Sequence, residues 1–167
     1  MSIWPSDIEE RAYSTVHDFT ARGLMVATAE SCTGGMIAAA LTEIPGSSAV
    51  VDRGFVTYSN EAKMQMIGVL WETLAAHGAV SRETAIEMAT GALSNSRADV
   101  SIAVTGIAGP GGGSAEKPVG LVHLAAARRN GEIFHREMLY GDIGRQGVRL
   151  ATVRTALEML MEVAASR

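Results

Sequence analysis

The pattern of apolar and polar positions predicts helices that alternate with short buried strands. Apolar residues recur at helical spacing over residues 7–22, 81–97 and 148–165. Two short runs, residues 24–29 and 100–105, are almost wholly apolar, which is typical of strands that are covered on both faces of a sheet. The order of these segments predicts helices packed on a central sheet.

Capping signals set the expected ends of the helices. Ser6, with Glu9 three residues later, has the form of a capping box, and Gly23 is expected to end that first helix. Asn60 is the expected N-cap of a helix that reaches about residue 68, and Ser81 is the expected N-cap of the next long helix. Further helices are expected at residues 36–44, 71–77 (short or irregular) and 148–165.

The remaining apolar segments predict strands. Residues 49–58 should form one strand, or two strands broken near Gly54. Residues 119–128 and 132–140 flank Asn130-Gly131, a dipeptide typical of tight hairpins. The whole pattern predicts an α/β protein, a three-layer α/β/α sandwich with a mixed, mostly parallel sheet. Ligands of such sheets bind outside the carboxyl ends of strands, so the segments after residues 29 and 105 are the places to search.

Length and composition fit a single domain over residues 1–167. Apolar residues make up 47% of the chain and charged residues 19%, which favours a packed core over disorder. The formal net charge is −4 and no run of like charge occurs, so neither nucleic acid nor a membrane is expected as a partner. The single cysteine, Cys32, and an N-terminus without an apolar signal-peptide core predict a cytoplasmic protein.

The first candidate for chemistry is the turn Glu30-Ser31-Cys32-Thr33-Gly34-Gly35, which joins a predicted strand to a helix. Backbone N–H groups at such a junction can hold a phosphate or an oxyanion, and the glycines let a substrate approach. Ser31 is either the N-cap of the helix or a nucleophile. Cys32 is a weaker candidate because no histidine stands in a motif that would activate it.

Lys63 is the second candidate, and it is one of only two lysines in the chain. We expect it in the first turn of a helix, where the helix dipole disfavours a positive charge and lowers the pKa. A lowered pKa suits a general base, whereas the plainer alternative is a solvent-facing lysine. Tyr58 ends the preceding strand and could relay a proton or hold Lys63 in place.

The third candidate is the glycine-rich loop after residues 100–105. Its backbone N–H groups could bind a phosphate through Thr105, Gly106, Gly109, Gly111, Gly112 and Gly113. It is neither a Walker loop nor a Rossmann fingerprint, because no Gly-Lys-Ser/Thr ends it and a strand follows it. A flexible connection is the alternative, but loops of this length are more often functional. Scattered histidines and one cysteine give no metal-ligand spacing, so neither a metal nor a cofactor is expected.

Four segments of the chain, in this order and spacing, resemble the CinA C-terminal domain family, which includes the nicotinamide-nucleotide amidases (PncC). The matching segments are residues 28–35, 56–63, 79–81 and 105–112, and the resemblance covers nearly the whole chain, in the stand-alone form of the family. Residues 141–149 are two residues longer than the family's Gly-Asp-Arg-x-x-Val/Ile-Arg pattern. The retained spacing to Val148-Arg149 aligns Arg145 with the first arginine of that pattern.

The resemblance implies hydrolysis of nicotinamide mononucleotide to nicotinate mononucleotide and ammonia, in pyridine-nucleotide recycling. It places the family's nucleophile on Ser31, its lysine on Lys63 and its tyrosine on Tyr58. The turn from Cys32 to Gly35 is then expected to bind the oxyanion, the glycine loop to line the nucleotide cleft, and Arg145 to hold the phosphate. The alternatives are an amidase for another small carboxamide, and a non-catalytic interaction module linked to competence or DNA damage. Helix faces rich in alanine and methionine would permit a homodimer, and they fit core packing equally well.

Overall fold

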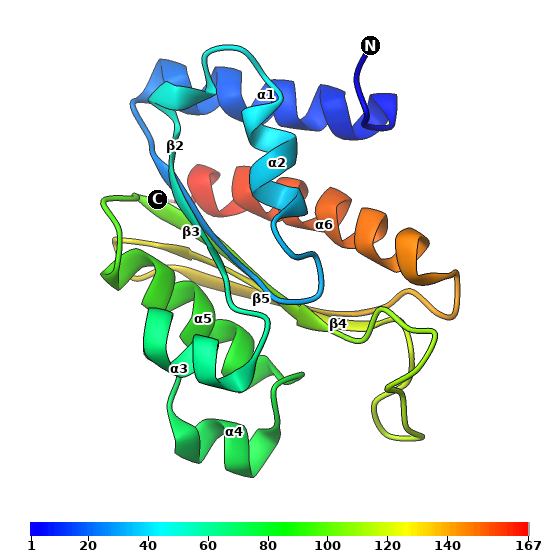
Figure 1. Ribbon diagram of the computed structural model, residues 1–167. Helices are drawn as coiled ribbons and strands as arrows, with labels where there is room; N and C mark the ends of the chain where they lie inside the picture. Colours follow the sequence, from blue (N-terminus) through cyan, green and yellow to red (C-terminus); the bar gives the residue numbers. More distant parts are fainter. Residues whose placement is uncertain (167) are drawn as a thin grey trace.

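The computed structural model describes residues 1–166, so Arg167, the last residue of the expected domain, lies outside the described part. Helices and strands follow one another as in Figure 1: α1 (Ser6–Arg22), β1 (Val26–Glu30), α2 (Met36–Thr42), a 3-10 turn η1 (Ser47–Ala49), β2 (Val51–Val56), α3 (Asn60–Ile67), α4 (Trp71–His77), α5 (Arg82–Ser94), β3 (Val100–Gly106), β4 (Leu121–Arg128), β5 (Ile133–Leu139) and α6 (Arg145–Ala165). No helix in this part of the chain is both long enough and apolar enough to cross a bilayer.

The strands of residues 1–166 form one five-stranded sheet in the order β2-β1-β3-β4-β5. β1 pairs in parallel with β2 and with β3, while β4 pairs antiparallel with both β3 and β5. Strands β2, β1, β3 and β5 therefore run in one direction and β4 opposes them, which confirms the expected mixed, mostly parallel sheet. The two short apolar runs form β1 and β3, which are buried because strands flank them and helices cover both faces.

Helices cover both faces of this sheet and create two cores (Figure 1). Helices α1, α2 and α6 enclose one core, which includes Phe19, Ile102 and Leu157. Helices α3, α4 and α5 lie on the other face, over a core that includes Met88 and many alanines. These three layers confirm the expected α/β/α sandwich.

One glycine sets the distance between α3 and α5. A Cβ at Gly91 of α5 would lie 1.9 Å from the carbonyl oxygen of Ile67 in α3. Any other residue would push the two helices apart, because a real Cβ cannot approach an oxygen so closely. The position of α3 matters for function because this helix carries Lys63.

Two of the predicted N-caps are wrong. Ser6 lies inside α1, and Pro5 precedes the helix and accepts the first backbone hydrogen bonds through its carbonyl, without a side-chain cap. Ser59 rather than Asn60 caps α3, because the Ser59 side chain accepts a hydrogen bond from the Ala62 N–H while Asn60 is already helical. The other two expectations are confirmed, since Gly23 ends α1 in the left-handed conformation and Ser81 caps α5.

Three other boundaries also differ from the expectation. Helix α5 ends at Ser94, three residues before the expected end. Strand β2 continues through Gly54, where a Cβ would lie 2.7 Å from Oγ1 of Thr28, so this glycine allows close packing rather than breaking the strand. Helix α6 begins at Arg145, three residues before the expected Val148, so Gly147 lies in its first turn, where a Cβ would lie 3.1 Å from Cγ1 of Ile143.

Candidate active site

A cavity of about 300 Å³, near the lower limit for small-ligand pockets, lies at the carboxyl ends of β1, β2 and β3. In Figure 1 this is the end of the sheet where the glycine-rich loop and the start of α6 also lie. The cavity is lined by Ser31, Cys32, Tyr58, Asn60, Lys63, Ala79, Val80, Thr105, Gly106, Ala108 and Arg145. The three candidate segments, which are far apart in the sequence, therefore contribute to one hollow.

Alternation along β1 explains how the candidate catalytic turn, residues 31–35, is arranged. Successive strand residues point to opposite faces, so Glu30 and Ser31 face opposite sides of the sheet. The buried Glu30 carboxylate accepts hydrogen bonds from the Thr33 hydroxyl at 2.6 Å and from the backbone N–H groups of Ile37 and Ala38 at 2.8 and 3.1 Å. Glu30 thus anchors the turn to α2, while Ser31 faces α3 and the cavity.

Lys63 meets Ser31 from the first turns of α3. The Lys63 amine nitrogen Nζ lies 3.1 Å from Oγ of Ser31, 2.8 Å from the Thr57 carbonyl oxygen and 3.4 Å from the Tyr58 carbonyl oxygen. The lysine is only 1% exposed, so it is not the solvent-facing lysine of the plainer alternative. It has no carboxylate within ion-pair distance among residues 1–166.

Burial lowers the pKa of Lys63, because an ammonium group loses its hydration inside the protein. Cys32, the alternative nucleophile, is affected in the opposite way. Its thiol is buried, and burial raises its pKa to about 12. A thiol with this pKa is almost wholly protonated near neutral pH, and the thiolate is the nucleophilic form. The site therefore favours Ser31 over Cys32 as the nucleophile.

Tyr58 and Arg145 form the rim of the cavity. The Tyr58 ring is largely exposed, and its hydroxyl oxygen accepts a hydrogen bond from Nη2 of Arg145 at 3.3 Å. Tyr58 approaches Lys63 through its backbone carbonyl rather than through its hydroxyl. Nη1 of Arg145 donates to the carbonyl of Gly109 at 2.9 Å, so Arg145 joins the start of α6 to the glycine-rich loop.

The structure brings only the first part of the glycine-rich loop to the cavity. Thr105 and Gly106 line it, and the Thr105 hydroxyl donates to the carbonyl of Ala79 at 2.8 Å. Ile107 bonds back to the start of β4, and the chain then leaves the site as the loop that hangs below the sheet in Figure 1. The predicted lining residues that lie outside the cavity are Gly109, Gly111, Gly112 and Gly113.

The second half of the predicted oxyanion turn also lies away from the cavity. Thr33 is fully buried with its hydroxyl bonded to Glu30. Gly34 and Gly35 adopt left-handed backbone conformations and line a separate hollow beside α2 and α6. Of the four turn residues assigned to substrate binding, Cys32 is the one that reaches the cavity.

Sequence reasoning missed two charged residues that hold the catalytic turn. Glu30 was read only as part of the motif, although an acidic residue at the end of an apolar strand signals a buried carboxylate with a specific partner. Arg149 donates from Nε to the Cys32 carbonyl at 3.1 Å and from Nη2 to the Thr33 carbonyl at 3.2 Å. Arg149 follows Arg145 by four residues, so both lie on one side of α6. This spacing is the feature of the sequence that could have placed Arg149 near the site.

The charges around the cavity are all of one sign. Among the residues described, the Arg145 guanidinium is the permanent charge in the lining, Lys63 is the other basic residue there, and no carboxylate lines the cavity. This is notable in a chain whose formal net charge is −4. The cavity therefore suits an anionic ligand. Residues 1–166 contain no group of three or more His, Cys, Asp or Glu side chains placed to hold a metal ion.

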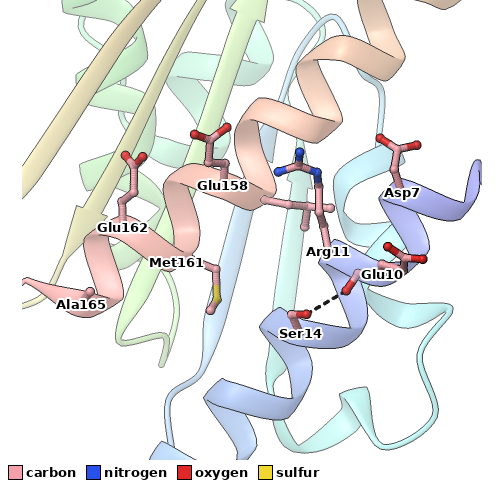
Figure 2. A pocket seen from close by; sticks show the side chains of 9 residues that line it. Asp7, Glu10, Arg11, Ser14, Glu158, Met161, Glu162 and Ala165 are labelled. Carbon is pink, nitrogen blue, oxygen red and sulfur yellow. Dashed lines mark hydrogen bonds between the residues drawn. The ribbon is translucent and has the colours of Figure 1, made fainter.

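A larger hollow, of about 650 Å³, lies between α1 and α6 and is shown in Figure 2. Carboxylates surround it, namely those of Asp7, Glu10, Glu158 and Glu162. Arg154 pairs with Asp7, and Arg136 pairs with Glu158 and Glu162, so these charges mainly tie α6 to its neighbours. Ser14 is the hydroxyl among the residues that line this hollow, and it donates to the backbone carbonyl of Glu10 rather than contacting a basic side chain, so the hollow is not a candidate active site.

Comparisons with known proteins agree with this picture. The family model described as CinA C-terminal domain matches residues 8–164. "Nicotinamide-nucleotide amidohydrolase PncC" of Escherichia coli (strain K12) is 57% identical over 143 residues, which cover 85% of this chain and 86% of that protein. The crystal structure of competence/damage inducible protein CihA from Agrobacterium tumefaciens is 70% identical, with a TM-score of 0.97 over 98% of this chain and 99% of that one. The crystal structure of competence damage-inducible protein A (ComA) from Klebsiella pneumoniae is 38% identical, with a TM-score of 0.90 over 96% of this chain and 99% of that one. The chain therefore belongs to the CinA C-terminal domain family.

Proposed function

We propose that this protein hydrolyses nicotinamide mononucleotide to nicotinate mononucleotide and ammonia, with Ser31 as the nucleophile and Lys63 as the general base. The observation that carries the proposal is the 3.1 Å contact between Nζ of a buried, unpaired lysine and Oγ of a serine at the wall of a cationic cavity. A relative that is 57% identical bears the name nicotinamide-nucleotide amidohydrolase, which supports this choice of substrate.

The three oxygen neighbours of Lys63 can accommodate a neutral amine as well as an ammonium. A neutral amine has two N–H donors and one lone pair. Two of its three neighbours are carbonyl oxygens, of Thr57 and Tyr58, which can only accept. The third is the Ser31 hydroxyl oxygen, to which Nζ donates in the structure; with a neutral amine the bond can reverse, and the hydroxyl then donates its proton to the lone pair. The two carbonyls can thus orient the lone pair of a neutral Lys63 toward Ser31 before substrate binds, and burial lowers the pKa of the amine, which favours this neutral form.

The reaction follows from this geometry. Oγ of Ser31 attacks the carboxamide carbon, the hydroxyl proton moves to Nζ of Lys63, and the carbonyl electron pair moves onto oxygen. Collapse of this tetrahedral species breaks the C–N bond, and Lys63 returns the proton to the departing nitrogen, which leaves as ammonia. Water then attacks the Ser31 ester, gives its proton to Lys63, and releases the carboxylate together with a restored Ser31.

The oxyanion requires a backbone donor close to Ser31. The Gly34 N–H already donates to the Ser31 carbonyl, and the N–H groups of Ile37 and Ala38 donate to Glu30. The Cys32 N–H has no backbone or side-chain acceptor in another residue of the described chain, and Cys32 lines the cavity. We therefore assign the Cys32 N–H as the oxyanion donor, which is a narrower choice than the whole turn.

Arg145 suits the phosphate of the substrate. Its guanidinium has five N–H donors and uses two of them, toward Gly109 and Tyr58. No carboxylate lies within ion-pair distance of it among residues 1–166. Binding the phosphate far from the amide would hold the amide near Ser31, so free nicotinamide is expected to be a poor substrate.

The substrate and the class of reaction are tested by ammonia release from four carboxamides with EDTA present: nicotinamide mononucleotide, nicotinamide, glutamine and asparagine. Activity on the mononucleotide alone is expected, because only this compound carries the phosphate that Arg145 would bind. EDTA should not reduce the activity, because the proposed chemistry uses no metal. Preference for glutamine or asparagine would identify a different amidase, and no release from any of them would favour the interaction module.

The role of Arg145 is tested separately with Arg145→Ala. The KM for the mononucleotide should rise much more than kcat falls, since the lost interaction is with a remote phosphate. Arg154→Ala is the matched control, because Arg154 lies on the same helix and pairs with Asp7 away from the cavity. An unchanged KM in Arg145→Ala would remove Arg145 from the phosphate site.

A further inference from the structure

Arg149 is a cation that holds two backbone carbonyls of the catalytic turn. It lies on α6, one helical turn beyond Arg145, and donates to the carbonyls of Cys32 and Thr33 at 3.1 and 3.2 Å. It has no carboxylate within ion-pair distance among residues 1–166. An arginine that donates hydrogen bonds to two neighbouring peptide carbonyls sets the orientation of both peptide groups.

Those peptide groups form a chain of hydrogen bonds that leads to the proposed oxyanion donor. The Thr33–Gly34 peptide accepts from Arg149 at its carbonyl, and its N–H, that of Gly34, donates to the Ser31 carbonyl at 3.1 Å. The Ser31–Cys32 peptide therefore accepts at its carbonyl. Because these peptides are trans, the N–H at its other end, that of Cys32, points away from this bond.

We propose that Arg149 is a positioning residue for the oxyanion donor: it orients the catalytic turn and polarises the peptide chain that ends at the Cys32 N–H. This inference rests on the proposed function for the identity of the substrate. Hydrogen bonds in a chain strengthen one another, so a guanidinium at one end makes the N–H at the other end a stronger donor. The effect is greatest in the transition state, when negative charge develops on the substrate oxygen.

The shape and the charge of arginine suit this position. Its planar fork can bond two adjacent carbonyls at once, which a lysine ammonium on a flexible stem cannot do with the same geometry. Glu30 holds the same turn from the other side, through the Thr33 hydroxyl and the start of α2. The turn is thus fixed between a buried anion and a cation, while Gly34 and Gly35 supply the left-handed conformations that it requires.

The test compares Arg149→Lys with the wild type by steady-state kinetics on nicotinamide mononucleotide. We expect kcat to fall by about 10- to 100-fold, less than the roughly 100- to 1,000-fold that follows loss of an oxyanion donor itself, with KM nearly unchanged. Arg154→Lys, a change of the same kind on the same helix, should leave both constants near their wild-type values. Melting temperatures establish that the variants are folded, and Arg149→Gln replaces Arg149→Lys if the latter is not.

A second readout does not depend on the substrate. A fluorophosphonate reacts with an activated serine: Oγ of Ser31 bonds to phosphorus, fluoride leaves, and Lys63 accepts the hydroxyl proton. The labelling rate, followed by intact-protein mass with Ser31→Ala as the blank, should fall in the Arg149 variant by a factor similar to the fall in kcat. Labelling at the wild-type rate, or an effect confined to KM, would overturn the role of Arg149.

The two readouts separate this inference from the proposed function. If the wild type releases no ammonia from the mononucleotide, the proposed substrate is wrong, and the labelling rates alone decide the role of Arg149. If the wild type is not labelled at Ser31, the activated serine and the positioning role of Arg149 are overturned together.

Discussion

The contact between Ser31 and Lys63 predicts that the two residues act as one unit. Lys63 Nζ, at 3.1 Å, is the only hydrogen-bond partner of Ser31 Oγ among residues 1–166. General-base catalysis is worth about 100- to 10,000-fold, which corresponds to about 2.7–5.4 kcal/mol of barrier. Lys63→Met should therefore reduce kcat by about that factor, and Ser31→Ala by at least as much. The double variant should be no worse than Ser31→Ala, because without the Ser31 hydroxyl no ester forms and Lys63 has neither the serine proton nor the proton of the attacking water to accept.

The assay is ammonia release from nicotinamide mononucleotide by the two single variants and the double variant, with melting temperatures as a check on folding. Lys117→Met is the matched control, because Lys117 is the other lysine of the chain and contacts the carbonyl of His77 rather than the cavity. If the two single losses multiply in the double variant, the residues act independently. That result would refute a Ser–Lys unit.

Four further predictions concern burial and packing. Activity should rise with pH, because the neutral Lys63 amine is the base. The midpoint should lie below the ordinary lysine pKa of 10.5, because burial lowers the pKa of Lys63. A profile of kcat/KM against pH tests this. Stability should also rise with pH between that lowered pKa and 10.5, because the unfolded amine binds more protons there, and urea titrations of wild type and Lys63→Met test this slope. Cys32→Ala should retain activity, and iodoacetamide at neutral pH should leave Cys32 unmodified in mass spectra, since its pKa is raised to about 12. Gly91→Ala should cost roughly 1–3 kcal/mol in urea unfolding and lower kcat, because its Cβ would lie 1.9 Å from the Ile67 carbonyl and displace α3; full stability would contradict this packing.

The fold could be predicted where a local pattern decides the structure. The runs that form β1 and β3 are short and mostly apolar, and they do not alternate between apolar and polar residues because both faces of these strands are buried. The hairpin at Asn130-Gly131 and the end of α1 at Gly23 follow from local backbone preferences. Each of these features depends on residues that are neighbours in the sequence.

The errors arose where packing overrides a local signal. Gly54 suggests a break in the strand and Val148 the start of the last helix, but Gly54 lies inside β2 and α6 already begins at Arg145. At Gly54, Oγ1 of Thr28 lies 2.7 Å from where a Cβ would be, so this glycine serves packing with the neighbouring strand. The same local reading gave Ser6 and Asn60 roles that belong to Pro5 and Ser59.

The sequence predicts the individual residues of the site but not the contacts between them. Ser31 and Lys63 could be singled out by residue type and by position at element ends, but their contact depends on how β1 pairs with β2 and on how α3 packs on α5. Arg149 was missed because its role depends on where α6 lies relative to the catalytic turn. Composition alone does not show that residues 109–113 lie outside the cavity lining, and their part in substrate binding stays a prediction.

The central claim is that Ser31 attacks the carboxamide and carries the acyl group. Rapid acid quenching during turnover of nicotinamide mononucleotide, followed by peptide mass spectrometry, tests it directly. The account predicts a nicotinoyl-nucleotide ester on the peptide that contains Ser31, assigned to Ser31 by fragmentation, together with loss of turnover in a folded Ser31→Ala variant. An acyl group on Cys32, or near-normal turnover in Ser31→Ala, would contradict it.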